Sequence, residues 1–338
     1  MSTRYTRDDI ARLAGVSPAT VSRVYNKPGL VSEEKVRRVR AVARRIGYAP
    51  DKAASSLRRR GTGTILMLER RQGARRIDAY GRLFYWSYAD ALREVQSVVD
   101  ASMYRLSLRY FSSVREIRTL GRRRVCDGVI GYSLGARVEA AALHGCGIPY
   151  VCGHFTDELT GFNRCCVDQR HGGRLAAAAL RDSGHTKPAH ITGELVRNAA
   201  CRLRWEGFRD GFAGCRPRLI DGGLGIAGGH ESARRLVRFV RSGRVDCVFV
   251  VNDVTAIGVL QAFNEASLAV PADVSVVGFD NSPVIATLPV KLATIDVVIG
   301  RAYATAANRL LEAMHDGRAI DERIEPVFVE GASIRART

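Results

Sequence analysis

The basic residues near the start of the chain form the first group whose types and spacing could do chemistry. Residues 1–60 hold 15 lysines and arginines and only five acidic residues, a net charge of +10 out of +18 for the whole chain. Cations that neutralise phosphates release the counterions condensed on a nucleic acid, so a basic segment this dense is typical of nucleic-acid binding. An arginine-rich proteome would explain why arginine outnumbers lysine, but not why the charge is concentrated here.

A glycine pattern in the second half of the chain points to a different chemistry. Gly223, Gly225 and Gly228 follow a strand-like run and open a helix, as the glycines of a dinucleotide-binding turn do. That kind of site needs an acidic residue about 20 residues later, at the end of the next strand. Here Asp246 begins that strand and Asp253 comes later than expected. A dinucleotide-dependent oxidoreductase with a basic N-terminal arm is therefore kept as the alternative function.

Two histidines and two cysteines are candidates for a metal site. His144, Cys146, Cys152 and His154 are residue types that soft metal ions prefer. The one-residue spacing within each pair would strain a tetrahedral site, so we predict no metal, and nothing in the sequence calls for a cofactor. The eight cysteines include no CxxC pair, which indicates small buried side chains rather than a disulfide framework. No catalytic Ser-His-Asp pattern or P-loop predicts an enzyme.

Composition excludes several classes of protein. With 46% hydrophobic and 25% charged residues, the chain has an ordinary globular composition. It has no run of the roughly 18 to 20 apolar residues that a membrane span requires. The first ten residues, MSTRYTRDDI, lack the apolar segment of a secretory signal. We therefore expect a cytoplasmic protein that does not act at a membrane.

Three short helices are expected to position the basic residues. Thr6 and Asp9 predict a capped first helix, which Gly15 ends. Ser17 can cap a second helix that begins at Pro18, where the missing N–H has no cost. A third amphipathic helix closes the small core. Two short helices joined by a glycine-containing turn predict a helix-turn-helix, whose second helix enters the major groove of DNA.

The remaining 278 residues have a different pattern. From Gly63 onward, apolar runs typical of buried strands alternate with amphipathic helices; the first examples are Ile65–Leu68, a helix over 89–101, and Arg105–Leu108. This alternation predicts βαβ units and parallel sheets, and the amount of chain suggests two lobes. The expected fold is an all-α helix-turn-helix head followed by an α/β core of two parallel-sheet lobes, with a ligand site between them.

Several runs resemble those of a known family. DDIARLAGVSPATVSRVYN resembles the helix-turn-helix of the LacI/GalR family of bacterial transcription regulators, and YAPDKAASSLRRR resembles its hinge. VDQRHGGRLAAAALRDSGHTKPAHITG, ACRLRWEGFRDGF, VFVVNDVTAIGVLQAFNEASLAVPADVSVVGFDNSP and LATIDV resemble, in that order, its periplasmic-binding-protein-like core. The resemblance implies three parts. These are a DNA-binding domain at 1–49, a hinge at 50–62, and a two-lobed effector-binding and dimerisation core at 63–338.

The resemblance assigns roles to residues of the head and hinge. The side chains it implies as phosphate anchors are Thr6, Ser17, Ser22 and Asn26. Pro18, Ala19 and Arg23 would face the bases, where an arginine can bond O6 and N7 of guanine. Ala54 and Leu57 lie in the hinge, and Leu57 is the expected wedge that kinks the minor groove. We therefore expect sequence specificity to depend on Arg23, the wedge and the half-site spacing.

The resemblance also implies an effector site between the lobes. It places Arg204 and Asp253 in the interlobe cleft, where they would hold the effector. An arginine beside a carboxylate suits a polyhydroxy ligand, because the carboxylate accepts from hydroxyls and the arginine donates. Tyr88, His171 and Asn198 are further candidates for effector binding. The alternative for Arg204 and Asp253 is a structural ion pair across the lobes.

Two departures from the family bear on the effector. The segment after the first core strand carries Arg70, Arg71, Arg75 and Arg76, which favour an acidic ligand such as a sugar acid or a sugar phosphate. Leu224 stands where some sugar-binding members carry an aromatic ring, so a hexose that needs stacking is less expected.

The expected protein is a homodimeric transcription regulator, with repression as the expected mode. It would bind a palindromic operator in double-stranded DNA under the control of a small-molecule effector, namely a sugar, sugar acid or sugar phosphate. The last residues show no heptad pattern, which favours a dimer over a tetramer. One alternative remains within the same class: a regulator whose core responds to a partner protein instead of a metabolite.

Overall fold

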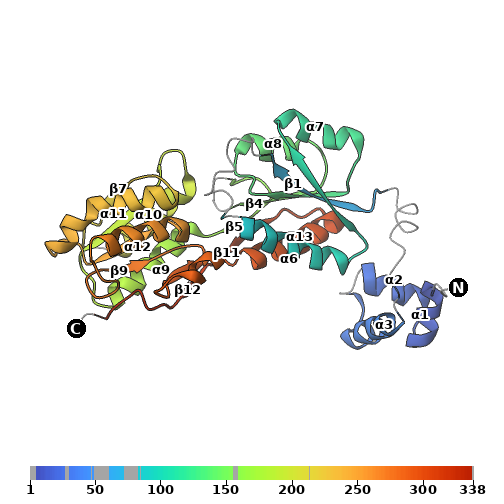
Figure 1. Ribbon diagram of the computed structural model, residues 1–338. Coiled ribbons are helices and arrows are strands. Elements are labelled where there is room, and N and C mark those ends of the chain that lie inside the picture. Colours follow the sequence, from blue (N-terminus) through green and yellow to red (C-terminus); the bar gives the residue numbers. More distant parts are fainter. Residues whose placement is uncertain are drawn as a thin grey trace.

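The computed structural model describes residues 5–26, 30–46, 48, 61–71, 83, 85–154, 159–212 and 214–336, with the backbone alone for Asn26 and His154. Ala54 and Leu57, the predicted hinge residues, lie outside the described residues. Within the described residues the chain forms a helical head and two α/β lobes (Figure 1). The predicted fold class is confirmed.

The head consists of three helices around a small apolar core. They are α1 (Arg7–Ala14), α2 (Pro18–Asn26) and α3 (Glu33–Arg45). Gly15 ends α1 in the left-handed conformation, with φ of 62°, which glycine adopts without steric cost. Val21 and Val24 of α2 are fully buried against α1 and α3. Their spacing of three residues leaves the opposite face of α2 in solvent.

The first lobe is built on a six-stranded parallel sheet. Its strand order is β11-β5-β4-β3-β1-β2. The strands are β1 (Thr64–Arg70), β2 (Arg105–Phe111), β3 (Gly128–Tyr132), β4 (Tyr150–His154), β5 (Arg164–Val167) and β11 (Asp321–Ile324). The helices are α6 (Tyr85–Asp100), α7 (Val114–Arg123), α8 (Arg137–His144) and α13 (Ile299–Asp316). Figure 1 shows α7 and α8 on one face of this sheet and α6 and α13 on the other.

The second lobe is built on a four-stranded parallel sheet with the order β7-β6-β8-β9. The strands are β6 (Pro188–Thr192), β7 (Arg218–Asp221), β8 (Cys247–Val250) and β9 (Ser275–Val277). The helices are α9 (Gln169–Asp182), α10 (Ala199–Gly211), α11 (Gly225–Arg241), α12 (Asp253–Glu265) and the 3₁₀ helix η2 (Pro283–Thr287). Helices α11 and α12 cover one face of the sheet with an apolar core of their own.

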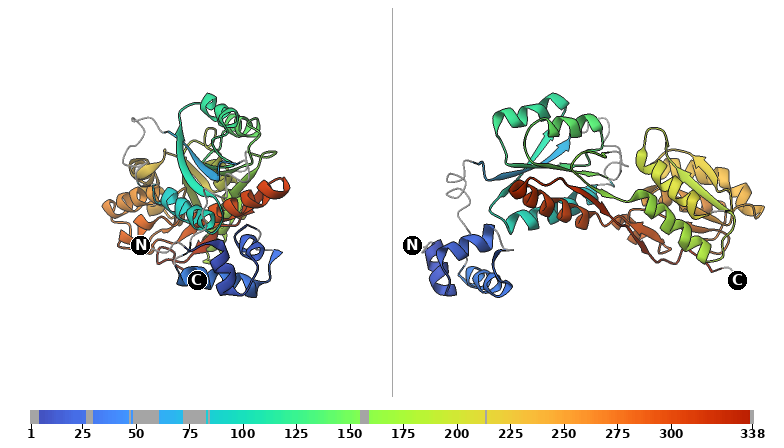
Figure 2. Two further views of the ribbon diagram at one scale, coloured as in Figure 1. Left: turned by 90° about the vertical axis from the view of Figure 1, so that its right-hand side faces the viewer. Right: turned by 180° about the vertical axis from the view of Figure 1, so that it is seen from behind.

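The chain passes between the lobes three times. It leaves the first lobe after β5, returns before α13, and leaves again after β11. The strands β10 (Thr294–Asp296) and β12 (Val327–Val329) pair antiparallel beside these crossings. Figure 2 shows the two lobes side by side, joined by the crossing segments. Residues distant in sequence therefore meet near the carboxyl ends of the strands, where ligands of parallel sheets bind.

Two glycines allow α9 and α10 to pack with their backbones in close contact. A Cβ atom at Gly173 would overlap the carbonyl oxygen of Arg204, and one at Gly207 would overlap that of Arg170. This approach brings the start of α9 next to the middle of α10. No helix in the described part of the chain is both long and apolar enough to cross a membrane.

Candidate functional site

The exposed face of α2 is the first candidate site. Pro18, Ala19 and Arg23 are all exposed, on the side of the helix opposite the buried Val21 and Val24. No carboxylate among the described residues pairs with the Arg23 guanidinium, so it can bond a ligand without first breaking an ion pair. Such a short helix, with its apolar side in the core and its start exposed, has the geometry of a major-groove reader.

Two hydroxyls at the starts of α1 and α2 act as helix caps. Thr6 Oγ1 accepts a hydrogen bond from Asp9 N (3.3 Å), and Asp9 Oδ2 accepts one from Thr6 N (2.9 Å), which makes a capping box. Ser17 Oγ accepts from Thr20 N (3.1 Å). Both predicted caps are confirmed. Both hydroxyls lie on exposed residues, where they remain within reach of a phosphate.

The second candidate site is a buried polar cluster around Arg204 in the second lobe. Arg204 comes from α10, and 5% of it is exposed. Its Nε donates to Gln169 Oε1 (2.8 Å), and its Nη1 donates to the carbonyl oxygen of Val251 (2.5 Å). Its Nη2 donates to Asp280 Oδ1 (3.3 Å), and the guanidinium stacks over the Phe279 ring at 3.7 Å from the centroid. The carboxylate partner of Arg204 is thus Asp280.

Asp253 has different partners. Its Oδ1 accepts from Thr294 Oγ1 (2.7 Å), and its Oδ2 accepts from Ser282 N (2.7 Å). It is fully buried and ties the start of α12 to the turn after β9. Burial and the nearby Asp280 carboxyl raise the pKa of Asp253 well above its ordinary value. Through these two accepted hydrogen bonds the Asp253 carboxyl braces the turn after β9.

Asp280 occupies a strained turn. Its φ is 106°, and that of Asn281 is 55°; side chains other than glycine seldom adopt such values, and in structures they cluster at functional sites. Burial raises the pKa of Asp280 to about 6, although the Arg204 guanidinium acts in the opposite direction. At neutral pH the carboxyl is ionised and paired with Arg204.

In the first lobe, tyrosines surround an acidic residue at the ends of the strands. Glu69 of β1 pairs in register with Tyr110 of β2 and Tyr132 of β3, so the three side chains share one face of the sheet. Tyr88 of α6 packs edge-on against Tyr132, with centroids 4.8 Å apart. Burial raises the pKa of Glu69, and it raises the pKa of Tyr88 to about 12. Tyr88 is therefore a neutral hydrogen-bonding group beside a carboxyl.

Comparison with known proteins decides the family. Residues 6–51 match the family described as bacterial regulatory proteins, lacI family, and residues 177–334 match the periplasmic binding protein-like domain. The ribose operon repressor of Escherichia coli (strain K12) is 32% identical over 342 residues, covering 97% of this chain and 99% of that protein. The chain belongs to the lacI family of bacterial transcription regulators.

Further relatives agree with this lacI-family membership. The HTH-type transcriptional repressor PurR of Vibrio cholerae serotype O1 (strain M66-2) is 29% identical, covering 98% of this chain and 99% of that protein. A lac repressor dimer bound to operator and an anti-inducer superposes with a TM-score of 0.66 at 24% identity over 99% of this chain and 100% of that one. A complex of the regulator CelR with cellobiose gives 0.65 at 24% identity, over 98% and 100%. These two structures establish the fold.

Membership of the lacI family places the chain among transcription regulators and not among enzymes. The structure explains the glycine pattern without a dinucleotide. Gly225 is the first residue of α11, and Gly223 has φ of 83° in the turn before it. Asp246 accepts from the backbone N–H groups of Thr186 (3.2 Å) and Lys187 (3.1 Å), so its carboxylate already has structural partners.

The four residues of the candidate metal pattern have structural surroundings where their side chains are described. The Cys146 thiol donates to the carbonyl oxygens of Ile117 and Ala142, both at 3.1 Å. Burial raises the pKa of Cys152 to about 12, which keeps its thiol protonated. The ring of His144 packs against Tyr150 and Phe162. The His154 side chain lies outside what the structure describes.

The remaining predicted effector residues have separate positions. Asn198 caps α10, its Oδ1 accepting from Cys201 N (3.2 Å). His171 lies half-buried in the first turn of α9. Sequence reasoning missed Gln169, Asp280 and Glu69. A usable signal for Asp280 was available, because it follows β9 at the same sheet edge where Asp253 follows β8.

Proposed function

We propose that this lacI-family regulator is a repressor that binds a palindromic operator as a homodimer and is controlled by a small-molecule effector. The exposed face of α2 is the observation that supports DNA binding. Pro18, Ala19 and Arg23 face solvent there, while Val21 and Val24 pack the helix against the rest of the head. The repressor names of the PurR and ribose operon relatives support repression. We expect the protein to act in the cytoplasm.

The proposed division of the chain follows from this role. Residues 1–49 would bind DNA, residues 50–62 would form the hinge, and residues 63–338 would bind the effector and dimerise. Thr6, Ser17, Ser22 and Asn26 would contact phosphates, and Ala54 and Leu57 would contact the minor groove.

For the effector we propose a sugar, held at the strand ends around Arg204 and Asp280. The names of related proteins support this class: a ribose operon repressor, a regulator in complex with cellobiose, and a regulator with bound ribose. Hydroxyl groups suit the Arg204–Asp280 pair because a diol can both donate to the carboxylate and accept from the guanidinium. Tyr88, His171 and Asn198 would complete the site, with Asp253 as the brace of the Asp280 turn.

The charges favour a neutral sugar over a sugar acid or sugar phosphate. Arg70 donates to Glu139 and its guanidinium lies over the Phe111 ring, so its charge is already compensated. Arg204 is neutralised by Asp280, and Glu69 adds a carboxyl at the strand ends of the other lobe. Arg71 is exposed, and Arg75 and Arg76 lie outside the described residues. An acidic ligand would therefore find no uncompensated charge on Arg70 or Arg204.

A homodimer is supported by the edge strand β2. Among the described strands, β2 pairs with β1 alone, and its Leu108 and Tyr110 side chains are about half exposed. An edge strand with exposed apolar side chains is a favourable surface for a second copy. We expect Leu108→Lys to convert the dimer to a monomer in sedimentation experiments, while Val138→Lys, on the exposed side of α8, leaves the dimer intact.

Selection of bound duplexes from a random DNA pool tests the DNA-binding proposal. At roughly physiological salt, non-specific binding is suppressed, and the full-length protein should enrich a palindrome. Added ribose should then change the affinity for that palindrome, and ribose 5-phosphate should have less effect. Enrichment of unrelated sequences alone would contradict operator binding, and equal or stronger action of the phosphate would contradict the neutral effector.

A further inference from the structure

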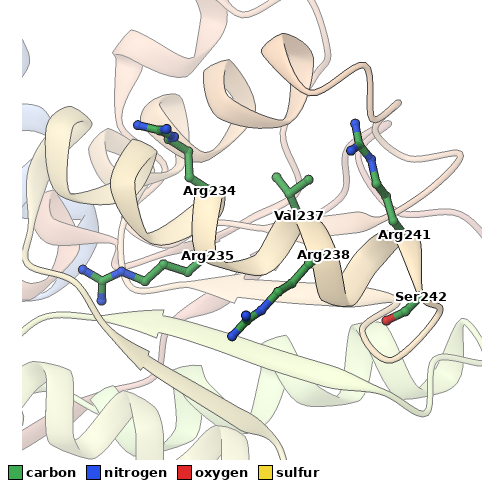
Figure 3. Close-up of a pocket in the computed structure, with 6 residues that line it drawn as sticks. All are labelled: Arg234, Arg235, Val237, Arg238, Arg241 and Ser242. Atoms are coloured by element: carbon green, nitrogen blue, oxygen red, sulfur yellow. The ribbon is translucent and has the colours of Figure 1, made fainter.

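The outer surface of α11 contains an open groove whose lining is mostly arginine. The lining residues are Arg234, Arg235, Val237, Arg238, Arg241 and Ser242 (Figure 3). Figure 3 shows Arg235 and Arg238 extending to one side of the helix, and Arg234, Val237 and Arg241 extending to the other. Four of the six lining side chains are thus arginines, and Val237 is the one apolar residue among them.

More arginines gather at the end of this groove, around one aromatic ring. The guanidinium of Arg218, from the edge strand β7, lies 3.8 Å from the centroid of the Phe239 ring. Those of Arg238 and Arg244 lie at 4.7 and 4.8 Å. Three cations around one ring repel one another, and each cation–π contact offsets part of that repulsion. An anion placed there would be attracted by all three.

Carboxylates are scarce beside this surface. Arg234 and Arg235 share one acidic partner, Glu231, at 3.9 and 3.7 Å. Arg241 Nη2 donates to the carbonyl oxygen of Ala266 (2.9 Å), which leaves its charge uncompensated. Within the described ranges, no carboxylate lies within 4.0 Å of Arg218, Arg238, Arg241 or Arg244.

Helix stability accounts for only part of this cluster. Cations in the last turn of a helix interact favourably with its dipole, which explains Arg238 and Arg241. The dipole does not explain Arg218 on the neighbouring strand, or Arg234 and Arg235 nearly two turns from the helix end. The positive charge extends over the whole groove, and the effector site described above does not use it.

We propose that the α11 groove binds an acidic segment of a partner protein. From Arg234 to Arg241 the helix rises about 10.5 Å, which an extended chain spans in about three or four residues. Side chains at every second position of an extended segment point to the same face, so acidic residues at alternate positions would meet the arginines together. Arginine is also enriched in protein interfaces, where its planar fork bonds carboxylates through two hydrogen bonds.

Other anions fit the surface less well. Single-stranded nucleic acid binds on aromatic rings that stack with its bases, but Phe239 is 9% exposed and guanidiniums cover it. A small anion would meet convergent guanidiniums only beside Phe239, whereas the arginines along the groove itself extend to opposite sides of one helix (Figure 3). An extended acidic peptide uses both sides at once.

The test measures binding of labelled peptides to the full-length protein by fluorescence anisotropy. The probe is a peptide of about eight residues with alternating glutamate and valine, which is longer than the groove. Its control has glutamine in place of glutamate. We expect the acidic peptide to bind, the control to bind at least about tenfold more weakly, and affinity to fall with added salt.

Two charge-matched triple variants locate the site. Arg234→Gln/Arg238→Gln/Arg241→Gln should weaken binding of the acidic peptide about tenfold or more. Arg115→Gln/Arg118→Gln/Arg122→Gln removes the same charge from an exposed face of α7 and should change affinity less than about twofold. Circular dichroism of both variants checks that they fold. Absence of peptide binding, or an equal loss in both variants, overturns the proposal. Tighter binding of a single-stranded oligonucleotide of equal charge would overturn it in favour of a nucleic-acid site.

Discussion

The Nη2 atom of Arg204 lies 3.3 Å from Oδ1 of Asp280, and the side chains are only 7% and 8% exposed. Asp253, although also buried close to Asp280, forms its hydrogen bonds with Ser282 and Thr294. A guanidinium withdrawn from water needs a carboxylate at hydrogen-bonding distance, because a buried charge without a partner is costly. The pair therefore holds α10 and the turn after β9 in one fixed arrangement.

Removing one partner of this pair should strongly destabilise the second lobe. We expect Asp280→Ala to lower the free energy of unfolding by about 3–5 kcal/mol at neutral pH, since the buried Nη2 donor of Arg204 loses the Asp280 carboxyl that accepts its hydrogen bond. Urea unfolding followed by the fluorescence of Trp205, which lies beside Arg204 in α10, measures this. The control is Asp182→Ala, which breaks the exposed pair with Arg181 and should cost about 0–1 kcal/mol. Equal losses would show that the buried pair has no special role.

Stability should depend on pH through Asp280. Its pKa is about 6 in the folded protein and 3.8 for the unperturbed group, so between these values the native state binds a proton that the unfolded chain releases. The contribution to the free energy of unfolding is therefore largest below about pH 4 and is lost as the pH rises towards 6, with a slope of at most about 1.4 kcal/mol per pH unit. Asp280→Asn should flatten this part of the profile. An unchanged slope in urea unfolding between pH 4 and pH 6 would contradict this assignment.

The close approach of α9 and α10 should not tolerate a methyl group at Gly207. In Gly207→Ala the new Cβ meets the backbone of Arg170, which cannot move without separating the helices. We expect a loss of about 1–3 kcal/mol and weaker effector binding, because Gln169 moves away from Arg204. Gly145→Ala is the matched control. There φ is −69° and the nearest atom lies 3.4 Å away, so thermal unfolding should change little.

We expect Arg23 to distinguish between bases of the operator, and we expect Arg12 not to do so. Both are exposed arginines of the head, Arg23 on α2 and Arg12 on α1, so their replacement by alanine removes equal charge. With the selected palindrome and its single-base variants, Arg23→Ala should lose about 1–3 kcal/mol of discrimination at one position of each half-site. Arg12→Ala should weaken binding to all sequences alike, if it weakens binding at all. Intact discrimination in Arg23→Ala would place the base contacts elsewhere.

Local elements were predictable where neighbouring residues suffice to form them. The capping box of Thr6 with Asp9 and the left-handed Gly15 fix both ends of α1 through contacts within one turn. The predicted helix over 89–101 begins earlier in the structure, at Tyr85 of α6. The first turn of α6 carries aromatic side chains. From the periodicity of the sequence, this turn could not be distinguished from a loop. In the structure, Tyr88 of this turn packs against Tyr132, a contact that the local sequence does not predict.

The sequence by itself determined the helix-turn-helix head, the alternation that builds two parallel-sheet lobes, and the basic charge of the first 60 residues. These follow from periodicity, caps and composition, which are local properties. Only the tertiary structure decided that Asp280, and not Asp253, pairs with Arg204, and that Glu69 lies between two tyrosines. Those pairs join residues from separate strands and helices. The distances between these side chains depend on which strand ends lie next to one another in the folded sheets. The spacing of the residues in the sequence does not encode this order.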